Sequence, residues 1–383
     1  MASSPSTLSS KPGYQTHISE TFTGARPFTL PPDSGFSLNL NLTDLIDAQD
    51  DQGRTPVHYV TIQNDFYSLY LLAEKGANLD MADTDGRTAL HIASKQGQLS
   101  MVDYLLEKRV WLEGWDKRGL TALHLAAMKG HTEAVRSMLR VAAQRGIRDL
   151  RNMQEDFYSR TSLHYAVLTV RLETVKALVE ELGDGGCVSR TGKKDASGHL
   201  DILDHQGRTA LHVACTILAQ NQTQSQEQGQ SHHEISRAAS AIVGVLMDAG
   251  ASLDIRDFQG RTALHLACAI MSRVQMQTRE HGNTGHDINH LASLTVSTLV
   301  DAGAKLDIQD DMGCTPLMYA AQGAHLGAIR CLVDKDSNVD AVDGQQWTAR
   351  DYAEHDATQG QDRDEVLRIL SPSRLMDPFL RLQ

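Results

Sequence analysis

The sequence predicts an all-α protein, built as a solenoid of about eight stacked helix-turn-helix units that each carry a β-turn finger. The first observation behind this prediction is a recurring threonine, which in six units is followed three residues later by a histidine. These threonines are Thr55, Thr88, Thr121, Thr161, Thr209, Thr262, Thr315 and Thr348. The second is their spacing of 33, 33, 40, 48, 53, 53 and 33 residues, which is typical of a unit of about 33 residues with insertions.

The threonine predicts the start of the first helix in each unit. Before Thr88, Asp85 and Gly86 form a sequence typical of a tight turn, and the threonine side chain can accept a hydrogen bond from a free amide of the first helical turn. In two units the next residue is Pro56 or Pro316, which the first helical position tolerates because its amide has no partner within the helix. We therefore expect each threonine to be an N-cap.

A second helix and a finger complete the unit. In the second unit, Gly97 interrupts the first helix, and residues 101–106 then have apolar side chains at helical spacing. Where second helices end, Gly76, Gly250 and Gly303 are suited to the left-handed conformation that closes a helix. The segment that leads from there to the next turn is expected to project as a finger.

These residues resemble the ankyrin repeat family. The family's phrase Gly-x-Thr-Pro-Leu-His-x-Ala is nearly intact at residues 53–60, 86–93, 119–126, 207–214 and 260–267, and three degenerate copies continue the series. The resemblance covers most of residues 37–370. It implies an L-shaped unit of two antiparallel helices and a β-turn finger, stacked into a curved solenoid that binds other macromolecules.

Composition changes along the chain predict four regions. Residues 1–36 are rich in Ser, Thr, Pro and Gly, which predicts a disordered leader. Leucine-rich residues 37–49 are expected to form a divergent N-terminal cap. Residues 50–356 contain the repeats, with units beginning near Asp50, Asp83, Asp116, Asp156, Asp204, Asp257, Asp310 and Asp343. Residues 357–383 are expected to supply a cap helix at about 364–370 and a loose tail.

Insertions are expected in the later repeats. About seven residues are added around 144–156 and about fifteen after the second helix of repeat four, including the glycine-rich residues 183–198. Repeats five and six each gain about twenty residues between their paired helices, around 220–234 and 275–289. Because the two repeats are adjacent, we expect these insertions to lie side by side, as polar loops.

Charge and cysteine content restrict the classes of partner and the compartment. A formal net charge of -12 argues against nucleic acid or an anionic membrane, and favours a protein partner with a basic patch. The five cysteines contain no C-x-x-C pair and are interpreted as free, buried thiols. With no apolar run long enough for a membrane span, the sequence favours the cytoplasm or the nucleus.

The repeated histidines invite a catalytic or metal interpretation, which their position argues against. They are His58, His91, His124, His164, His212 and His265. In the first helical turn an imidazole can hydrogen-bond backbone groups between repeats, so we expect a structural role. Arg54, Arg87, Arg208 and Arg261, which precede the threonines, are likewise interpreted as framework residues.

The finger tips predict the binding surface, because residues between framework positions face outward and are free to vary. The candidates for partner binding are aromatic anchors with polar neighbours: Trp111, Trp115, Arg118, Phe157, Tyr158, His205, Arg256, Phe258 and Gln259. Some of these aromatics, Trp111 above all, could instead fold back on their own finger. The first hypothesis is a non-enzymatic interaction scaffold or adaptor that binds a partner through a concave face of fingers and first helices.

An alternative hypothesis is an atypical enzyme or metal-dependent protein that uses the paired insertions of repeats five and six. His232 and His233 lie in one insertion and His281, His286 and His290 in the next, with His286 and His290 at helical i, i+4 spacing. Nearby glycines and the lack of a cysteine weaken this candidate zinc site. The sequence shows no nucleophile elbow, phosphate loop or dinucleotide fingerprint, so no cofactor is expected and a non-enzymatic role is favoured.

Overall fold

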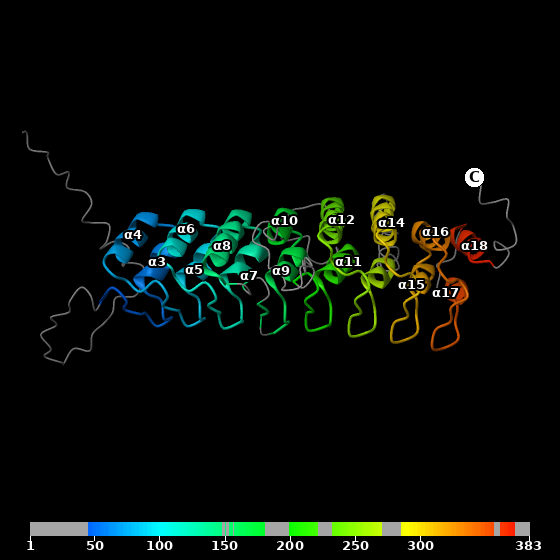
Figure 1. Cartoon of the computed structure of the whole chain (residues 1–383), viewed down its shortest axis with the longest axis horizontal. Helices are drawn as coiled ribbons and strands as arrows, with labels where there is room; N and C mark the ends of the chain where they lie inside the picture. Colours follow the sequence, from blue (N-terminus) through cyan, green and yellow to red (C-terminus); the bar gives the residue numbers. More distant parts are fainter. Residues whose placement is uncertain are drawn as a thin grey trace, which may run out of the picture. The chain divides into compact units, whose positions relative to one another are not determined.

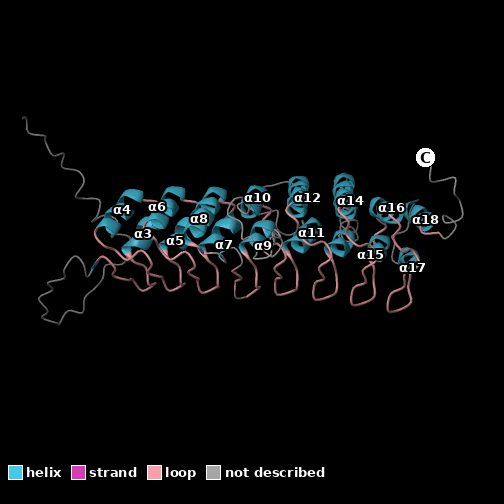
Figure 2. Cartoon of the chain, in the orientation of Figure 1, coloured by secondary structure: helices cyan, strands magenta, loops and turns pink. Residues whose placement is uncertain are grey.

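The computed structural model describes residues 45–147, 150, 153–155, 157–180, 199–220, 232–269, 285–355 and 361–371. The chain divides into two compact units, residues 1–42 and 43–383, and every described residue belongs to the second. Within the described residues the regular structure is helical, as predicted (Figure 2). The predicted leader, and residues 37–44 of the predicted cap, lie outside them.

The helices come in successive pairs. The pairs are α3 (Pro56–Ile62) with α4 (Phe66–Glu74), α5 (Ala89–Gln96) with α6 (Leu99–Glu107), α7 (Ala122–Lys129) with α8 (Thr132–Arg145), α9 (Ser162–Leu168) with α10 (Leu172–Glu180), α11 (Ala210–Gln220) with α12 (His232–Asp248), a helix at 263–269 with α14 (Gly285–Asp301), α15 (Pro316–Gln322) with α16 (Leu326–Asp334), and α17 (Ala349–His355) with α18 (Gln361–Ile369). The predicted helix-turn-helix units are therefore confirmed.

The pairs stack in sequence order. First helices contact first helices, from α3 through α5, α7 and α9 to α11 and again between α15 and α17. Second helices contact second helices from α6 through α8, α10, α12, α14 and α16 to α18. Figure 1 shows two rows of helices, with the fingers projecting beside the row of first helices. The fold is thus a solenoid in which each unit packs against its neighbours.

Local sequence sets the ends of the helices. Thr88 is the N-cap of α5, as the sequence predicts, and its backbone is extended. Pro56 and Pro316 occupy the first turns of α3 and α15. Gly76 and Gly250 follow second helices with φ of +86° and +90°, the left-handed conformation expected at these caps.

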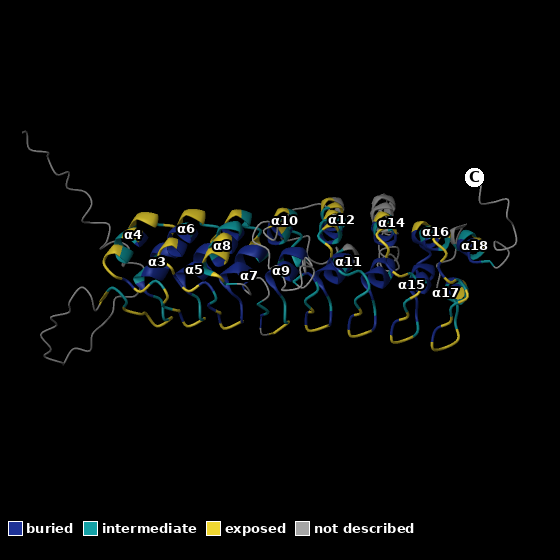
Figure 3. Cartoon of the chain, in the orientation of Figure 1, coloured by how far each residue is buried: buried dark blue, intermediate teal, exposed yellow. Residues whose placement is uncertain are grey.

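Small and large apolar side chains alternate in the core between units. Leu90, Leu123 and Leu211 occupy equivalent positions in first helices and are at most 1% exposed. Three residues further on, Ala93 and Ala126 are fully buried, which allows neighbouring helices to approach closely. Burial of one such leucine stabilises the fold by about 2 kcal/mol. In Figure 3 dark blue accordingly predominates along the first helices from α5 to α15.

The insertions of repeats five and six differ in part from the expected loops. α12 begins at His232 and α14 at Gly285, and each is 17 residues long, whereas α4 and α6 have nine. Residues 232–234 and 285–289, which we expected in polar loops, are therefore helical, because the added residues extend the second helices towards their N-termini. α12 and α14 contact each other, and residues 221–231 and 270–284 lie outside the described residues.

Candidate functional site

An aspartate organises the turn of each regular finger. In the second finger, Asp83 Oδ1 accepts hydrogen bonds from the backbone amides of Asp85 and Arg87, both at 2.9 Å. The Asp83 amide in turn donates to the Arg87 carbonyl oxygen at 2.9 Å. Gly86 has a φ of +77°, which a residue with a side chain adopts at a cost. The arrangement closes the turn and fixes the tip residues relative to the helix that follows.

Arginine neutralises the buried finger aspartate in three repeats. Arg208 donates from Nε and Nη2 to Asp204 Oδ2 at 3.0 and 2.8 Å, and the Asp204 carboxylate is fully buried. Arg87 pairs with Asp83 and Arg261 with Asp257 in the same way. Burial alone would raise the pKa of Asp204, but the bonds from Arg208 and the backbone outweigh it, and the pKa is lowered. These arginines are framework residues, as predicted.

The fourth finger corrects a predicted repeat boundary. We expected Asp156 to take the framework position, but Glu155 holds it: its amide donates to the Arg160 carbonyl oxygen at 3.0 Å, and its side chain accepts from the amides of Phe157 and Tyr158. The turn is one residue longer than in the other fingers. The longer glutamate side chain spans this wider turn. The spacing of aspartates in the other fingers predicts the adjacent residue, Asp156, instead.

The repeated histidines bridge successive repeats. The Nδ1 atom of each accepts from the backbone amide of the N-cap threonine, at 3.0–3.3 Å, so the proton resides on Nε2. Nε2 then donates to a carbonyl oxygen in the next repeat, for example from His164 to Arg208 at 3.1 Å and from His265 to Cys314 at 3.1 Å. The predicted structural role is confirmed.

Burial keeps these imidazoles neutral. Loss of solvent lowers the pKa of all six bridging histidines, and those of His124 and His164 fall to about 4. A charged imidazole would also lose its Nδ1 acceptor and face the threonine amide with a second donor. The neutral form is therefore part of the framework, and these side chains are unavailable for metal binding.

Aromatic and apolar side chains project from the tips of fingers four to seven. Phe157 is 67% exposed, Phe258 69% and Met312 65%, while Tyr158 and His205 are also exposed. We call these five residues the finger-tip row. Met312 was not among the predicted residues, although it occupies the same tip position as Gln259, because the prediction rested on aromatic anchors and their polar neighbours. Exposed tips line one edge of the molecule in Figure 3.

Backbone hydrogen bonds hold neighbouring fingers together. The amide of His205 donates to the Tyr158 carbonyl oxygen at 2.8 Å, that of Phe258 to Gln206 at 3.1 Å, and that of Asp311 to Gln259 at 3.0 Å. Each finger therefore fixes the position of the next one. An array held in this way presents its tips with little conformational entropy left to lose on binding.

Side-chain contacts orient part of the row. The rings of Tyr158 and His205 meet edge to face with centroids 5.1 Å apart, and the Arg160 guanidinium lies 4.5 Å from the centroid of the Tyr158 ring. Phe258 lies against Gly207, where a β-carbon would stand 2.5 Å from a ring carbon of the phenylalanine. Tyr158, His205 and Phe258 thus pack along consecutive fingers while remaining exposed.

The polar candidates lie beside the row. Arg256 donates to the Gly260 carbonyl oxygen at 3.0 Å and pairs with Asp311 at 3.2 Å, which links fingers six and seven. Arg118 is largely exposed, 3.5 Å from the Asp116 carboxylate. Gln259 is exposed at the tip of finger six.

The two tryptophans occupy the third finger and its approach. Trp111 is exposed, and its ring lies 3.3 Å from the point where Gly114 would carry a β-carbon, so it folds back over its own loop. Trp115 is 38% exposed directly before the framework Asp116. Trp115 therefore lies at the base of the third finger, and among the described residues no aromatic ring contact joins it to the finger-tip row.

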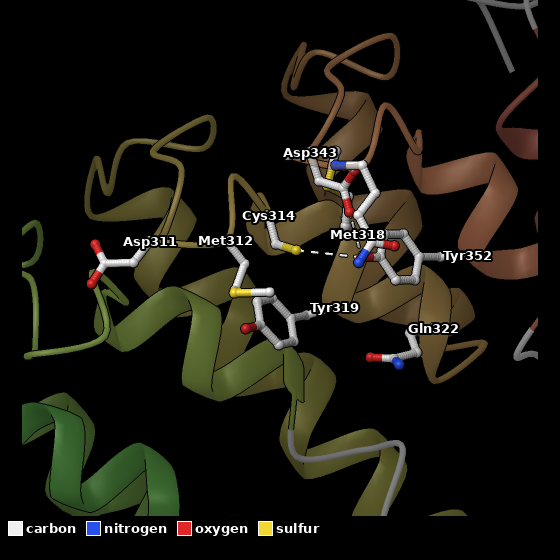
Figure 4. Close-up of a pocket in the computed structure, with 10 residues that line it drawn as sticks. Asp311, Met312, Cys314, Met318, Tyr319, Gln322, Asp343 and Tyr352 are labelled. Atoms are coloured by element: carbon white, nitrogen blue, oxygen red, sulfur yellow. Dashed lines mark hydrogen bonds between the residues drawn. The ribbon is translucent and has the colours of Figure 1, made fainter.

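A hollow of about 410 Å³ opens between repeats seven and eight, and we call it the 7–8 hollow. Its lining comes from two finger tips and two first helices: Asp311, Met312, Cys314, Met318, Tyr319, Gln322, Asp343, Gly344, Gln345 and Tyr352. Figure 4 shows the sulfur atoms of Met312 and Cys314 and the tyrosine rings around it. The hollow adjoins Met312 and so continues the finger-tip row.

The side chains of the candidate metal residues lie outside the described part of the structure. His286 and His290 lie in α14 and His232 and His233 in α12, but their side chains are outside the described part of the structure, as is His281. Among the side chains that are described, no group of three or more His, Cys, Asp or Glu residues could hold a metal ion.

The described cysteines are free, and most are buried. Cys215 and Cys268 are completely buried, and burial raises the pKa of Cys215 to about 12. Cys314 is buried as well, whereas Cys331 is partly exposed. The expectation of uniformly buried thiols is therefore wrong for Cys331, which packs against the edge of the core and stays partly exposed.

Family and structure comparisons agree on the fold. The family model for ankyrin repeats, in its three-copy form, matches residues 37–114, 110–190 and 288–375. The solved ankyrin repeat domain of Bcl-3, described as a unique member of the IkappaB protein family, superposes with a TM-score of 0.51. It is 21% identical and covers 74% of this chain and 99% of that one, a likeness that concerns the fold alone.

Three curated relatives match parts of the chain. The mouse (Mus musculus) B-cell lymphoma 3 protein homolog is 25% identical over 182 residues, 47% of this chain and 29% of that protein. Protein glp-1 of Caenorhabditis elegans is 30% identical over 224 residues, 58% and 14%. The chicken (Gallus gallus) nuclear factor NF-kappa-B p105 subunit is 27% identical over 154 residues, 36% and 14%. The chain spans less than a third of the length of each.

None of the helices described in this chain is both long and apolar enough to cross a membrane.

Proposed function

Because the chain belongs to the ankyrin repeat family, whose repeats generally mediate contacts between proteins, we propose that it is a non-enzymatic scaffold or adaptor. It binds a partner protein through the face formed by its fingers and first helices. The observation that carries the proposal is the finger-tip row, in which Phe157, Phe258 and Met312 are about two-thirds exposed on a hydrogen-bonded framework.

The chemistry of the row suits protein recognition. Exposed aromatic side chains on a rigid support bury large apolar areas at a low entropic cost, and they dominate many interfaces. Arg118, Arg256 and Gln259 lie beside them and supply hydrogen-bond donors that orient a partner. The net charge of -12 favours a partner with a basic patch over nucleic acid or an anionic membrane. We place the protein in the cytoplasm or the nucleus.

Alanine substitution of four anchors tests this proposal. We expect the combined variant of Trp115, Phe157, Tyr158 and Phe258 to capture none of the proteins that the wild-type chain retains from a lysate, as quantified by mass spectrometry. Its helical circular dichroism and thermal unfolding midpoint should stay close to wild type, since these side chains are exposed.

A matched control removes exposed apolar side chains from second helices instead. Tyr67, Leu99 and Leu294 lie in α4, α6 and α14, and each is more than one-third exposed. Their combined alanine variant should retain the wild-type set of captured proteins. Unchanged capture by the four-anchor variant, or equal loss by both variants, would reject the finger face as the binding surface.

A further inference from the structure

We propose that the 7–8 hollow is a subsite for a basic side chain, lysine or arginine, of the bound partner. The inference rests on the proposed function, because the hollow lies on the same face as the finger-tip row. It adds the chemistry of one contact: a cation enters where repeats seven and eight have Cys314 and Trp347 in place of the framework arginine of repeats one, two, five and six.

Two substitutions within the repeat phrase distinguish this junction. Repeat seven has Cys314 where repeats one, two, five and six have arginine, and Met318 where the first six repeats have the bridging histidine. Met318 Sδ accepts from the Thr315 amide at 3.3 Å, but the thioether has no proton to donate to repeat eight. The Thr315 hydroxyl, whose counterparts bond the histidine, is buried without a partner. The inter-repeat bridge is therefore missing where the hollow opens.

The missing arginine leaves negative charge uncompensated. Asp310 and Asp343 are 6% and 5% exposed, and neither forms an ion pair with any described residue. Tyrosine hydroxyls replace the guanidinium: Tyr319 donates to Asp310 at 2.7 Å and Tyr352 to Asp343 at 2.7 Å. Backbone and tyrosine donors outweigh burial and lower the pKa of Asp343, so it is ionised at neutral pH.

The lining matches an amphipathic cation. The residues that enclose the hollow include two aspartates and no lysine or arginine. Met312, Met318 and the tyrosine rings supply apolar walls for an aliphatic stem, and ring faces attract a cation. Asp311 also lines the hollow and is exposed; its surface pair with Arg256 at 3.2 Å is a weak one. An acidic occupant would meet repulsion, while a purely apolar one would leave the carboxylates unneutralised.

Small amides test the subsite without knowledge of the partner. The full chain, labelled with ¹³C-methyl methionine, is titrated with N-acetylarginine amide, N-acetyllysine amide and N-acetylnorleucine amide at constant ionic strength. Met312→Leu and Met318→Leu assign the two methyl signals. We expect both signals to shift saturably with the basic amides, with dissociation constants on the order of 10 mM for a single side chain. Norleucine amide should bind at least tenfold more weakly.

Repeat one provides a matched control. It carries Arg54, His58 and Tyr59 after the same glycine, so Cys314→Arg with Met318→His gives repeat seven the framework residues of repeat one. This variant should keep the thermal midpoint within a few degrees. Its Met312 signal should no longer respond to basic amides, because residue 314 lines the hollow, where a guanidinium adds a positive charge, and the histidine restores the bridge to repeat eight.

The outcomes separate the subsite from the binding face. Equal binding of norleucine amide, absence of any shift, or a response that persists in the double variant would overturn the subsite. The four-anchor alanine variant leaves the lining of the hollow intact and should show the wild-type shifts. The capture experiment therefore tests the binding face, and the amide titration tests the hollow. A negative result in one does not decide the other.

Discussion

The Nε2 atom of His212 lies 3.1 Å from the carbonyl oxygen of Arg261, the residue that precedes the N-cap threonine of the next repeat. On its other side, the same imidazole accepts from the amide and bonds the hydroxyl of Thr209. One side chain thus joins the helix start of one unit to the finger base of the next. The threonine-histidine phrase is repeated because each junction needs such a link.

His212→Ala should lower the free energy of unfolding by about 2–4 kcal/mol, because it leaves buried backbone groups of two repeats without a partner and opens a cavity. The measurement is urea unfolding followed by circular dichroism. Gln206→Ala changes an exposed tip residue of the preceding finger and should stay within about 0.5 kcal/mol of wild type. Similar midpoints for the two variants would contradict the bridging role.

Stability should fall as the pH drops from about 6.5 towards 4. The folded chain lowers the pKa of the six bridging histidines, to about 4 for His124 and His164, so below 6.5 the unfolded chain binds more protons than the folded one. Each such histidine removes up to about 1.4 kcal/mol per pH unit in this window. Urea unfolding at pH 7.5, 6.5, 5.5 and 4.5 measures the slope; a flat profile would show that the histidines are not held neutral.

Most of the fold could be predicted from the periodic threonines, glycines and histidines, because each of these residues has one dominant local role in the repeat. A threonine at the position of Thr88 begins a helix, and a glycine at the position of Gly76 ends one. Because the histidine occurs in six repeats, a structural role was favoured over a role in one active site. Glu155 was missed because a longer acidic side chain can serve a longer turn, which the spacing of aspartates does not reveal. Met312 was missed because the predicted anchors were aromatic. The 7–8 hollow depends on packing between units, which local pattern does not encode.

Alanine substitution of Arg208 and of Arg118 should have different effects on the free energy of unfolding and on partner binding. Arg208→Ala leaves the fully buried Asp204 carboxylate without its cation, and we expect a loss of about 2–4 kcal/mol. Arg118→Ala removes a largely exposed side chain with a long 3.5 Å pair, so unfolding should change by less than about 0.5 kcal/mol. Capture of partners should nevertheless weaken in the Arg118 variant. Equal destabilisation of the two variants would contradict the distinction between framework and binding arginines.

Two glycines with left-handed backbones test the packing of the fingers. Gly207 and Gly250 have φ of +73° and +90°, so alanine strains both by about 1–2 kcal/mol. At Gly250 a β-carbon meets nothing within 4 Å, but at Gly207 it would stand 2.7 Å from the Phe258 backbone nitrogen and 2.5 Å from its ring. Gly207→Ala should therefore lower the free energy of unfolding in urea by at least about 1 kcal/mol more than Gly250→Ala, because finger six must move away.

The Gly207→Ala variant should also weaken partner capture, because Phe258 is displaced, whereas Gly250→Ala should not. Equal costs for the two variants would mean that Phe258 is not held by finger five, and the rigid finger-tip row would lose its physical basis.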